Sequence, residues 1–375
     1  EKYNDKIQSQ QSRNVVSNFR EAIARKSVYI NKSIFWLLMF SVYRFIKYLN
    51  DYYKSVRFIK NYKIKVIVTC ADRVPGMELP LIYAANKLKI KVIIPYTMSS
   101  YRDICLLVRK NDSLHQVSKY PYFIKILLGK IKHKNNHNGC MYYDVSNYLA
   151  LKFIGWLPDD PWIIGSTNKV IVCVDCEYNR QLHLKNRVGI KNIAIVGNYY
   201  TSNIKTSNKI LNVNKKIALL ALPQVVEQNL ISKKDFKVIC IDWINIICSH
   251  GFTVKISLHP HMELSEYKFL DGIRESVEII TCRISEKLNE ADIFIAQFSS
   301  IVWWANALGI RSIVLDHFGK NFNWFNGIEG VTVTKNNDDF IQALKNSSEY
   351  SFQPIAPVIK KEIVVKNYKQ LYSET

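Results

Sequence analysis

The sequence predicts an α/β protein made of two doubly wound domains and a helical N-terminal lead-in. Three observations support this fold class. The chain has 375 residues, which exceeds what one hydrophobic core usually organises. Short apolar runs of strand length alternate with segments of helical period, as in parallel sheets that helices cover. This alternation occurs in two series separated by a polar segment, so we expect two domains.

The composition indicates a folded protein with an excess of positive charge. Hydrophobic residues make up 48% and charged residues 22%, which excludes extended disorder. The net charge of +21 should attract nucleic acid, anionic lipid or anionic small molecules. No RNA-binding, zinc-finger or helix-turn-helix signature accompanies the charge, so we expect no nucleic-acid partner. A non-enzymatic protein that binds nucleic acid or lipid remains an open alternative.

The basic lead-in covers residues 1–62. Apolar residues recur there at spacings of three and four, with Lys and Arg between them, which predicts amphipathic helices. The uncharged core of its most apolar stretch, residues 33–43, is too short to span a bilayer that needs about 20 residues. No signal-peptide order precedes this stretch, and we expect a cytoplasmic protein.

The lead-in has two possible fates. In the first, its apolar stripe lies against the anionic inner face of a membrane. In the second, the stripe packs on the first domain as part of its core. The second alternative rests on Phe35, Trp36 and Phe40, which are large apolar side chains to leave exposed. The first rests on the basic residues Arg20, Arg25, Lys26, Lys32, Arg44, Lys47, Lys54, Arg57 and Lys60.

The first α/β domain covers residues 63–200. Its predicted elements are strand 63–70, helix 80–90, strands 91–96 and 169–174, helix 177–189 and strand 192–197. Cys173 and Cys176 form a single CxxC at one of these strands, and without a second pair we assign no metal to it. The 8 cysteines are dispersed, as free thiols in a reducing cytosol are.

The second α/β domain covers residues 201–350 and begins in a linker rich in Asn, Ser, Thr and Lys. Its predicted elements are strand 216–222, helix 235–251, strands 253–259 and 277–282, helix 285–291, strand 292–297, helix 300–309 and strands 311–316 and 330–334. Residues 351–375 are expected to return to the N-terminal domain. We expect the two domains to face each other across a cleft at the carboxyl ends of their strands.

Two polar motifs end strands of the second domain. His259 precedes Pro260, which favours an extended backbone and directs the imidazole into the crevice. Ser299 and Ser300 start a helix, where free N–H groups and hydroxyls suit a phosphate. A serine that only caps the helix is the simpler interpretation. The occurrence of both motifs at strand ends of one domain favours a phosphate site.

These motifs, together with residues 286–316, resemble the donor-binding domain of GT-B glycosyltransferases. The sequence is most similar to bacterial sialyltransferases and capsule Kdo transferases, over about residues 165–320. In these families the His-Pro histidine and a Ser-Ser or Thr-Ser pair hold the phosphate of a CMP-sugar. The resemblance therefore implies donor binding by His259, Pro260, Ser299 and Ser300, with no metal and no other cofactor. CDP-glycerol transferases share the same short motifs.

A further match follows the first strand of the second domain. Residues 222–228 resemble the Gln-Val-acidic segment of the capsule-type Kdo transferases, where an acidic residue beside the donor serves catalysis. The resemblance implies a catalytic role for Glu227 and donor binding by Gln224. The segment departs from the family pattern because it lacks a pair of adjacent acidic residues. An ordinary solvated glutamate near a helix start is the alternative.

The loop after the first strand of the N-terminal domain carries three charged residues. Asp72 or Glu78 is placed to take the proton of an acceptor hydroxyl as a general base. Arg73 is suited to hold a carboxylate of the donor sugar or the acceptor with two hydrogen bonds. In the alternative, Asp72 pairs with Arg73, and Glu78 stabilises the start of the next helix.

One other segment, residues 155–166, concentrates two tryptophans, two prolines and two acids just before a strand. Its aromatic faces suit sugar rings, and packing as core is the commoner fate of such tryptophans. Signatures of dinucleotide-binding, P-loop and hydrolase sites are absent from the sequence.

We therefore expect a glycosyltransferase that moves an ulosonic acid, Kdo or sialic-acid-like, from a CMP donor. The expected acceptor is a surface polysaccharide or glycolipid, such as capsule or lipopolysaccharide. The enzymatic alternative keeps the fold and uses a UDP-sugar or a CDP-polyol donor. The expected partners are a nucleotide sugar and a glycan or glycolipid acceptor.

Overall fold

The structure, a computed structural model, describes most of the chain between residues 34 and 373. The described residues are 34–76, 78–95, 102–110, 112–120, 122, 126, 136–137, 139–204, 216–227, 230–319, 323–348, 352–355 and 358–373. The predicted basic residues Arg20, Arg25, Lys26 and Lys32 lie outside them. Contacts divide the chain into two units: unit 1 holds residues up to 173 and residues 183–194, and unit 2 holds residues 174–182 and 195–374.

The first sheet, which lies mostly in unit 1, has the strand order β1-β2-β5-β6. Its strands are β1 (Val66–Val68), β2 (Lys91–Ile94), β5 (Ile171–Val174) and β6 (Ile193–Ile195). The pairs β1–β2 and β2–β5 are parallel. The accompanying elements are the helices α2 (Ile34–Asn61), α3 (Glu78–Lys87), α4 (Arg102–Lys110), α6 (Val145–Ile154) and α7 (Glu177–Lys185) and the short strands β3 (Asn136–His137) and β4 (Cys140–Met141).

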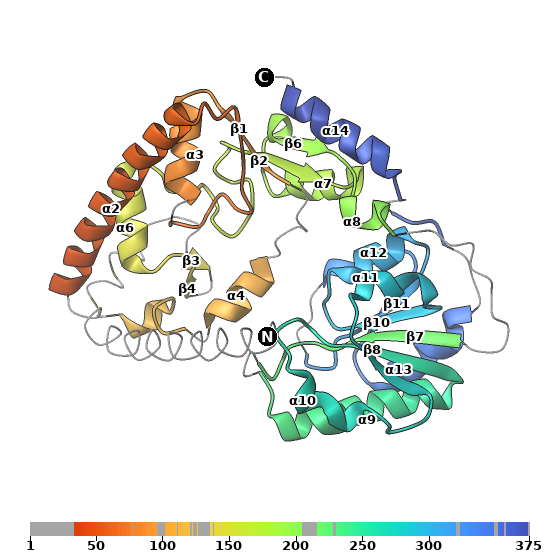
Figure 1. Cartoon of the computed structure of the whole chain (residues 1–375). Coiled ribbons are helices and arrows are strands. Elements are labelled where there is room, and N and C mark those ends of the chain that lie inside the picture. Colours follow the sequence, from red (N-terminus) through yellow and green to blue (C-terminus); the bar gives the residue numbers. More distant parts are fainter. Residues whose placement is uncertain are drawn as a thin grey trace, which may run out of the picture. The chain divides into compact units, whose positions relative to one another are not determined.

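Helix α2 packs along α3 and α6 (Figure 1). Its inner face buries Leu37, Ser41 and Tyr48, which lie close together on one side of the helix. Asp144 caps α6 by accepting the N–H of Asn147 at 3.0 Å and forms an ion pair with Arg44 at 2.6 Å. Burial alone would raise the pKa of Asp144, but Arg44 and the cap hydrogen bonds hold that pKa below its usual value. Asp144, which caps α6, thus also anchors α2.

Within the described part of the chain, none of the helices combines the length and the hydropathy needed to cross a membrane.

The second sheet belongs to unit 2 and has six strands in the order β12-β11-β10-β7-β8-β9, all paired in parallel. The strands are β7 (Lys216–Ala221), β8 (Phe252–Ser257), β9 (Val277–Ile280), β10 (Ile293–Ala296), β11 (Arg311–Leu315) and β12 (Val331–Thr334). The helices are α8 (Tyr199–Ser202), α9 (Lys233–Ser249), α10 (Leu264–Tyr267), α11 (Ile284–Lys287), α12 (Ile301–Ala307), α13 (Asn337–Lys345) and α14 (Lys361–Ser373). These parallel sheets with their helices confirm the predicted α/β class.

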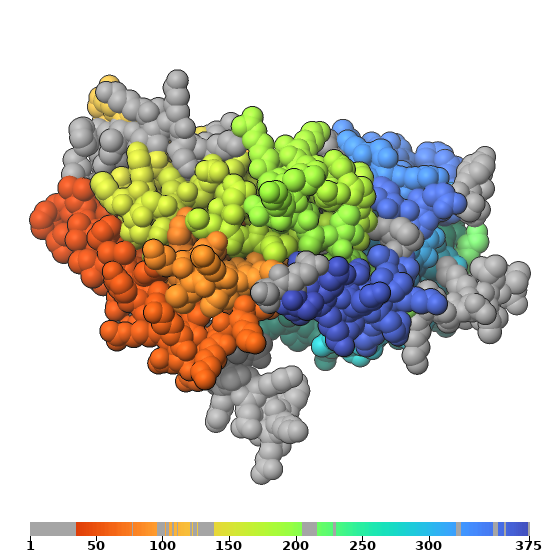
Figure 2. All heavy atoms as spheres, turned by 90° about the horizontal axis from the view of Figure 1, so that it is seen from above, coloured from red at the N-terminus to blue at the C-terminus, as the bar shows by residue number. Residues whose placement is uncertain are grey.

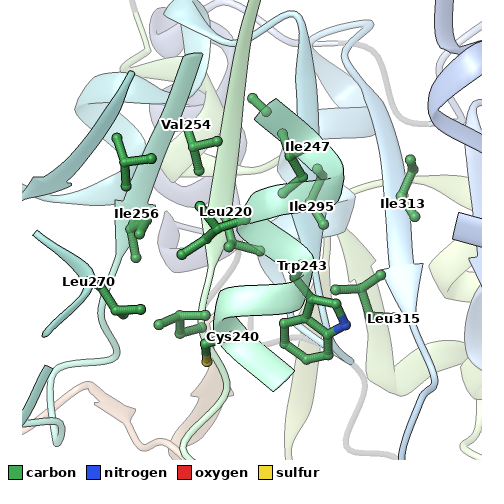
Figure 3. Packing of buried hydrophobic residues seen from close by; sticks show 14 of the residues in the cluster. Leu220, Cys240, Trp243, Ile247, Val254, Ile256, Leu270, Ile295, Ile313 and Leu315 are labelled. Carbon is green, nitrogen blue, oxygen red and sulfur yellow. The ribbon is translucent and has the colours of Figure 1, made fainter. Parts of the chain in front are cut away.

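The core of unit 2 lies between this sheet and α9 (Figure 3). Helix α9 buries Phe236, Cys240, Trp243, Ile244 and Ile247, whose spacing places them on one face of the helix. The strands contribute Leu220, Ile256, Ile295 and Ile313 from four neighbouring positions in the sheet. Because successive strand residues alternate between faces, the continuous apolar runs predict strands that are covered on both sides.

The C-terminal helix α14 packs on α8 within unit 2. The side-chain amide of Asn367 donates to the carbonyl oxygen of Val196 at 3.3 Å, just beyond β6. A Cβ atom at Gly197, whose φ is +86°, would lie 3.0 Å from a methyl group of Val364. The C-terminal segment therefore lies against the residues that follow the last strand of the first sheet.

Candidate functional site

The strand order of unit 2 places three polar segments at one edge of the sheet. From β7 the chain adds β8 and β9 on one side and then β10, β11 and β12 on the other, so the order switches between β7 and β10. Ligands of doubly wound sheets bind at the carboxyl ends of the strands beside such a switch. Parallel strands lie about 4.8 Å apart, so the ends of β10, β7 and β8 lie within roughly 10 Å of each other.

The segment after β8 is a closed turn that fixes His259. The backbone N–H of Met262 donates to the carbonyl oxygen of His259 at 2.8 Å, and the N–H of His259 contacts the sulfur of Met262 at 3.2 Å. Met262 is buried in the core of unit 2, whereas His259 is half-buried and Pro260 is exposed. Met262 thus anchors the turn in the core of unit 2, and the imidazole of His259 lies at the surface.

The hydrogen bonding of His259 defines which ring nitrogen can donate. Its Nδ1 accepts the backbone N–H of His261 at 3.3 Å, so the neutral ring carries its hydrogen on Nε2. Burial, with a smaller contribution from His261, lowers the pKa of His259, while Glu227 opposes this shift. A neutral imidazole with a free Nε2–H is suited to donate a hydrogen bond to an anionic oxygen.

Glu227 lies after β7, the neighbour of β8 in the sheet. Its Oε1 accepts a hydrogen bond of 2.8 Å from the hydroxyl of Tyr267, the last residue of α10. Burial, and then the bond with Glu227, raise the pKa of this tyrosine well above its usual value. Tyr267 was not predicted from the sequence, because its partner Glu227 lies 40 positions away. Gln224, the other predicted residue of this segment, is half-buried.

The two serines after β10 have different roles at the start of α12. The Oγ of Ser299 accepts the backbone N–H of Ile301 at 3.2 Å. Ser300 occupies the N-cap position without a side-chain cap bond and is exposed. Ser299 is therefore the serine that caps the helix, while the hydroxyl of Ser300 is free of helix contacts.

In unit 1, Asp72 is fully buried and serves as an acceptor for a distant segment. Its Oδ1 accepts the N–H of Gly165 at 2.9 Å, and its Oδ2 accepts the N–H and the hydroxyl of Thr167 at 3.0 and 2.6 Å. These bonds join the end of β1 to the loop before β5. Asp72 does not pair with Arg73, because its three hydrogen bonds all go to this loop. The surroundings of Asp72 favour a structural role over that of a base.

Glu78 is the first residue of α3, and its carboxylate has fewer hydrogen bonds than that of Asp72. Its Oε1 accepts a hydrogen bond of 3.0 Å from the thiol of Cys70, and this bond raises the pKa of Cys70. Its Oε2 is buried and has no hydrogen-bond partner among the described residues. This oxygen is therefore an unused acceptor, which could receive a hydrogen bond from a hydroxyl group. Between the two predicted bases, the geometry favours Glu78.

Arg73 lies in a cluster with Cys105, Arg109 and Tyr142. Its guanidinium donates to the carbonyl oxygen of Pro161 at 3.3 Å and to the sulfur of Cys105 at 3.8 Å. The guanidinium carbons of Arg73 and Arg109 lie 5.4 and 4.0 Å from the centroid of the Tyr142 ring. Neither guanidinium has a carboxylate partner among the described residues. Two such cations beside one ring are suited to an anionic ligand. The sequence did not predict Arg109.

The tryptophans of residues 155–166 are packed as core of unit 1. The ring of Trp156 stacks on Tyr83 at 4.8 Å, and the ring of Trp162 meets Tyr142 edge-on at 5.3 Å. Both tryptophans are buried. Of the two interpretations of this segment, the geometry favours packing over contact with a sugar.

Neither Cys173 nor Cys176 is part of a disulfide bond among the described residues. Burial, with Asp175 as a further cause, raises the pKa of Cys176 to about 12, so this thiol is protonated. In the described residues, no group of three His, Cys, Asp or Glu side chains is arranged to hold a metal ion.

Comparison with solved structures identifies the architecture. A putative UDP-N-acetylglucosamine 2-epimerase from Listeria monocytogenes aligns over 88% of this chain and 79% of its own, with 11% identity and a TM-score of 0.50. The chain has the GT-B fold. This confirms the predicted fold of two Rossmann-like domains with a helical N-terminal lead-in. At this identity the likeness carries the fold and no statement on the reaction.

Other solved structures show weaker likeness. The UDP-GlcNAc 2-epimerase of Methanocaldococcus jannaschii aligns over 86% of this chain and 80% of its own, with 15% identity and a TM-score of 0.49. The wall teichoic acid polymerase TagF aligns over 55% of this chain and 58% of its own, with 13% identity and a TM-score of 0.36. No protein-family model matches the sequence, and no curated protein matches it.

Proposed function

We propose that the protein is a GT-B glycosyltransferase that uses a nucleotide sugar, with a CMP-linked ulosonic acid as the donor. The observation that carries the proposal is the convergence of His259, Glu227 and Ser300 on the carboxyl ends of three adjacent strands around the switch point. One imidazole donor and the hydroxyl of Ser300 suit the single phosphate of a CMP-sugar. The cluster of Arg73 and Arg109 suits the carboxylate of an ulosonic acid or of an acidic acceptor.

The proposed reaction is a displacement at the anomeric carbon of the sugar. The acceptor hydroxyl transfers its proton to a general base, for which Glu78 is the candidate, while the hydroxyl oxygen bonds to the anomeric carbon. The bond between that carbon and the phosphate oxygen breaks, and CMP leaves. The Nε2–H of His259 and the hydroxyl of Ser300 stabilise the negative charge that develops on the leaving phosphate. Glu227, held by Tyr267, orients the donor beside His259.

A UDP-sugar enzyme, either a transferase or a UDP-GlcNAc epimerase, is the second candidate. It is considered because a protein of the same fold, from Listeria monocytogenes, is a putative UDP-N-acetylglucosamine 2-epimerase. The two candidates differ in the nucleotide they bind, and a thermal-shift panel of CMP, UDP, GDP and CDP separates them. A nucleotide at about 100 times its Kd stabilises the folded protein by about 2.7 kcal/mol. A response to CMP supports the first candidate, and a response to UDP alone moves the function to the second.

The donor site itself is tested with paired alanine variants. His259→Ala and Ser300→Ala should each weaken the binding of the responding nucleotide by about 1.5–3 kcal/mol, because each removes a hydrogen bond to a charged oxygen. The matched control is His250→Ala with Ser249→Ala, at the C-terminal end of α9 and thus at the opposite edge of the sheet. Unchanged affinity in both site variants would remove the assignment of this edge to the donor.

A further inference from the structure

The outer face of α2 carries a patch of exposed apolar side chains. Helix α2 buries Leu37, Ser41 and Tyr48 against its neighbours and leaves seven large apolar side chains exposed over its first turns. These seven residues, which we call the α2 patch, are Phe35, Trp36, Leu38, Met39, Val42, Tyr43 and Ile46. Figure 2 shows this helix at the surface of the molecule, in red to orange. The surfaces of soluble monomeric proteins rarely expose so many neighbouring large apolar side chains, so the α2 patch indicates a binding partner.

Positive charge follows the α2 patch along the same helix. Lys54, Arg57 and Lys60 are exposed and have no ion-pair partner among the described residues. The other two basic residues of α2 are paired, since Arg44 contacts Asp144 at 2.6 Å and Lys47 contacts Asp51 at 3.6 Å. The helix thus has an apolar half followed by a half with uncompensated positive charge.

We propose that α2 lies flat on an anionic lipid surface, with the α2 patch inserted at the level of the acyl chains. Residues 35–46 extend over about 18 Å of helix, which is shorter than the roughly 30 Å of a hydrocarbon core, so the patch lies in the interface without crossing it. Lys54, Arg57 and Lys60 then meet the phosphates of the lipid headgroups.

The sign of the charge favours an anionic surface over a second copy of the chain. Two copies with a net charge of +21 each repel one another, and the repulsion grows as the salt concentration falls. An anionic bilayer has the opposite sign and attracts the same residues more strongly at low salt. The exposure of Phe35 at 65% and of Trp36 at 40% also weighs against the alternative in which the stripe packs entirely as core.

The test is co-sedimentation of the full chain with vesicles of phosphatidylcholine alone or mixed with phosphatidylglycerol. Binding is expected with the mixed vesicles only and should be lost at high salt. Lys54→Gln with Arg57→Gln should weaken the partition about 30-fold, because two surface charges are removed. Lys366→Gln with Lys369→Gln, two exposed lysines on α14 at the same spacing, should leave it unchanged.

A second pair of variants tests the apolar half. Val42→Asp should weaken vesicle binding at least about tenfold, because it places a carboxylate at the acyl chains. Val238→Asp is the matched control: both valines lie on helices, and they are 58% and 55% exposed. Equal binding by the two variants, or no binding by the full chain, overturns the proposal. If Val42→Asp instead changes the oligomeric state, the occupant is a second copy. If Val42→Asp lowers the Tm and the unaltered full chain does not bind vesicles, another segment of the chain covers the α2 patch.

Discussion

Replacement of Asp72 by asparagine separates a structural carboxylate from a catalytic one. The carboxylate of Asp72 accepts three hydrogen bonds from Gly165 and Thr167. In Asp72→Asn the amide oxygen still accepts one backbone N–H, but the amide NH₂ group faces the other N–H and cannot accept it. A buried donor left without an acceptor costs about 1–3 kcal/mol, and the remaining bond loses its charge. We expect a total loss of about 2–4 kcal/mol in the free energy of unfolding.

The assay is thermal and urea unfolding, with turnover measured below the transition. For a unit of this size the loss corresponds to a decrease in Tm of about 5–15 °C. Asp159→Asn, an exposed carboxylate near the same loop, is the control and should change stability by less than about 0.5 kcal/mol. Turnover of folded Asp72→Asn should persist, whereas Glu78→Gln should bind nucleotide and lose turnover. An Asp72→Asn variant with normal stability and no turnover would refute this reasoning and return the base to Asp72.

Two further predictions concern Gly165 and the protonation of His259. Gly165→Ala should destabilise unit 1 strongly, because its φ is +89° and the added Cβ would lie 2.7 Å from Val172. Gly155→Ala, with a φ of +78° and no atom within 4 Å, should cost only about 1 kcal/mol in urea unfolding. Because the pKa of His259 is lowered in the folded protein, its contribution to stability is present above the unfolded pKa of about 6.5 and lost as pH falls. Protonation adds charge opposite to phosphate, so nucleotide affinity by calorimetry should rise as the pH falls through the lowered pKa of His259, and His259→Gln should abolish that rise.

The fold was largely predictable from the sequence because parallel strands that helices cover appear as continuous apolar runs. The predicted strands 216–222, 253–259 and 292–297 contain β7, β10 and most of β8. Several helices were not predicted, among them α4, α6, α13 and α14. For α6 the start and stop signals were present, since Asp144 caps its first turn and Gly155 ends it with a φ of 78°.

The candidate site was only partly predictable, because the sequence shows where a residue lies along a strand and not what it touches. The ends of β8 and β10 were predictable from His-Pro and Ser-Ser, since parallel strands bring their carboxyl ends to one edge. The role of Asp72 was not predictable, because its hydrogen-bond partners lie 93 and 95 positions away in the sequence. Separation in sequence also hid the approach of Arg73 and Arg109 to the ring of Tyr142.

Hydrogen–deuterium exchange of the full chain, with and without the nucleotide that stabilises it most, tests the central claim most directly. The account predicts slower exchange on nucleotide addition in residues 222–227, 258–262 and 297–302, the segments that follow β7, β8 and β10. The segments at the opposite edge of the sheet, around Ser249 and His250, should exchange at unchanged rates. Protection confined to other parts of the chain, with these three segments unaffected, would contradict the account.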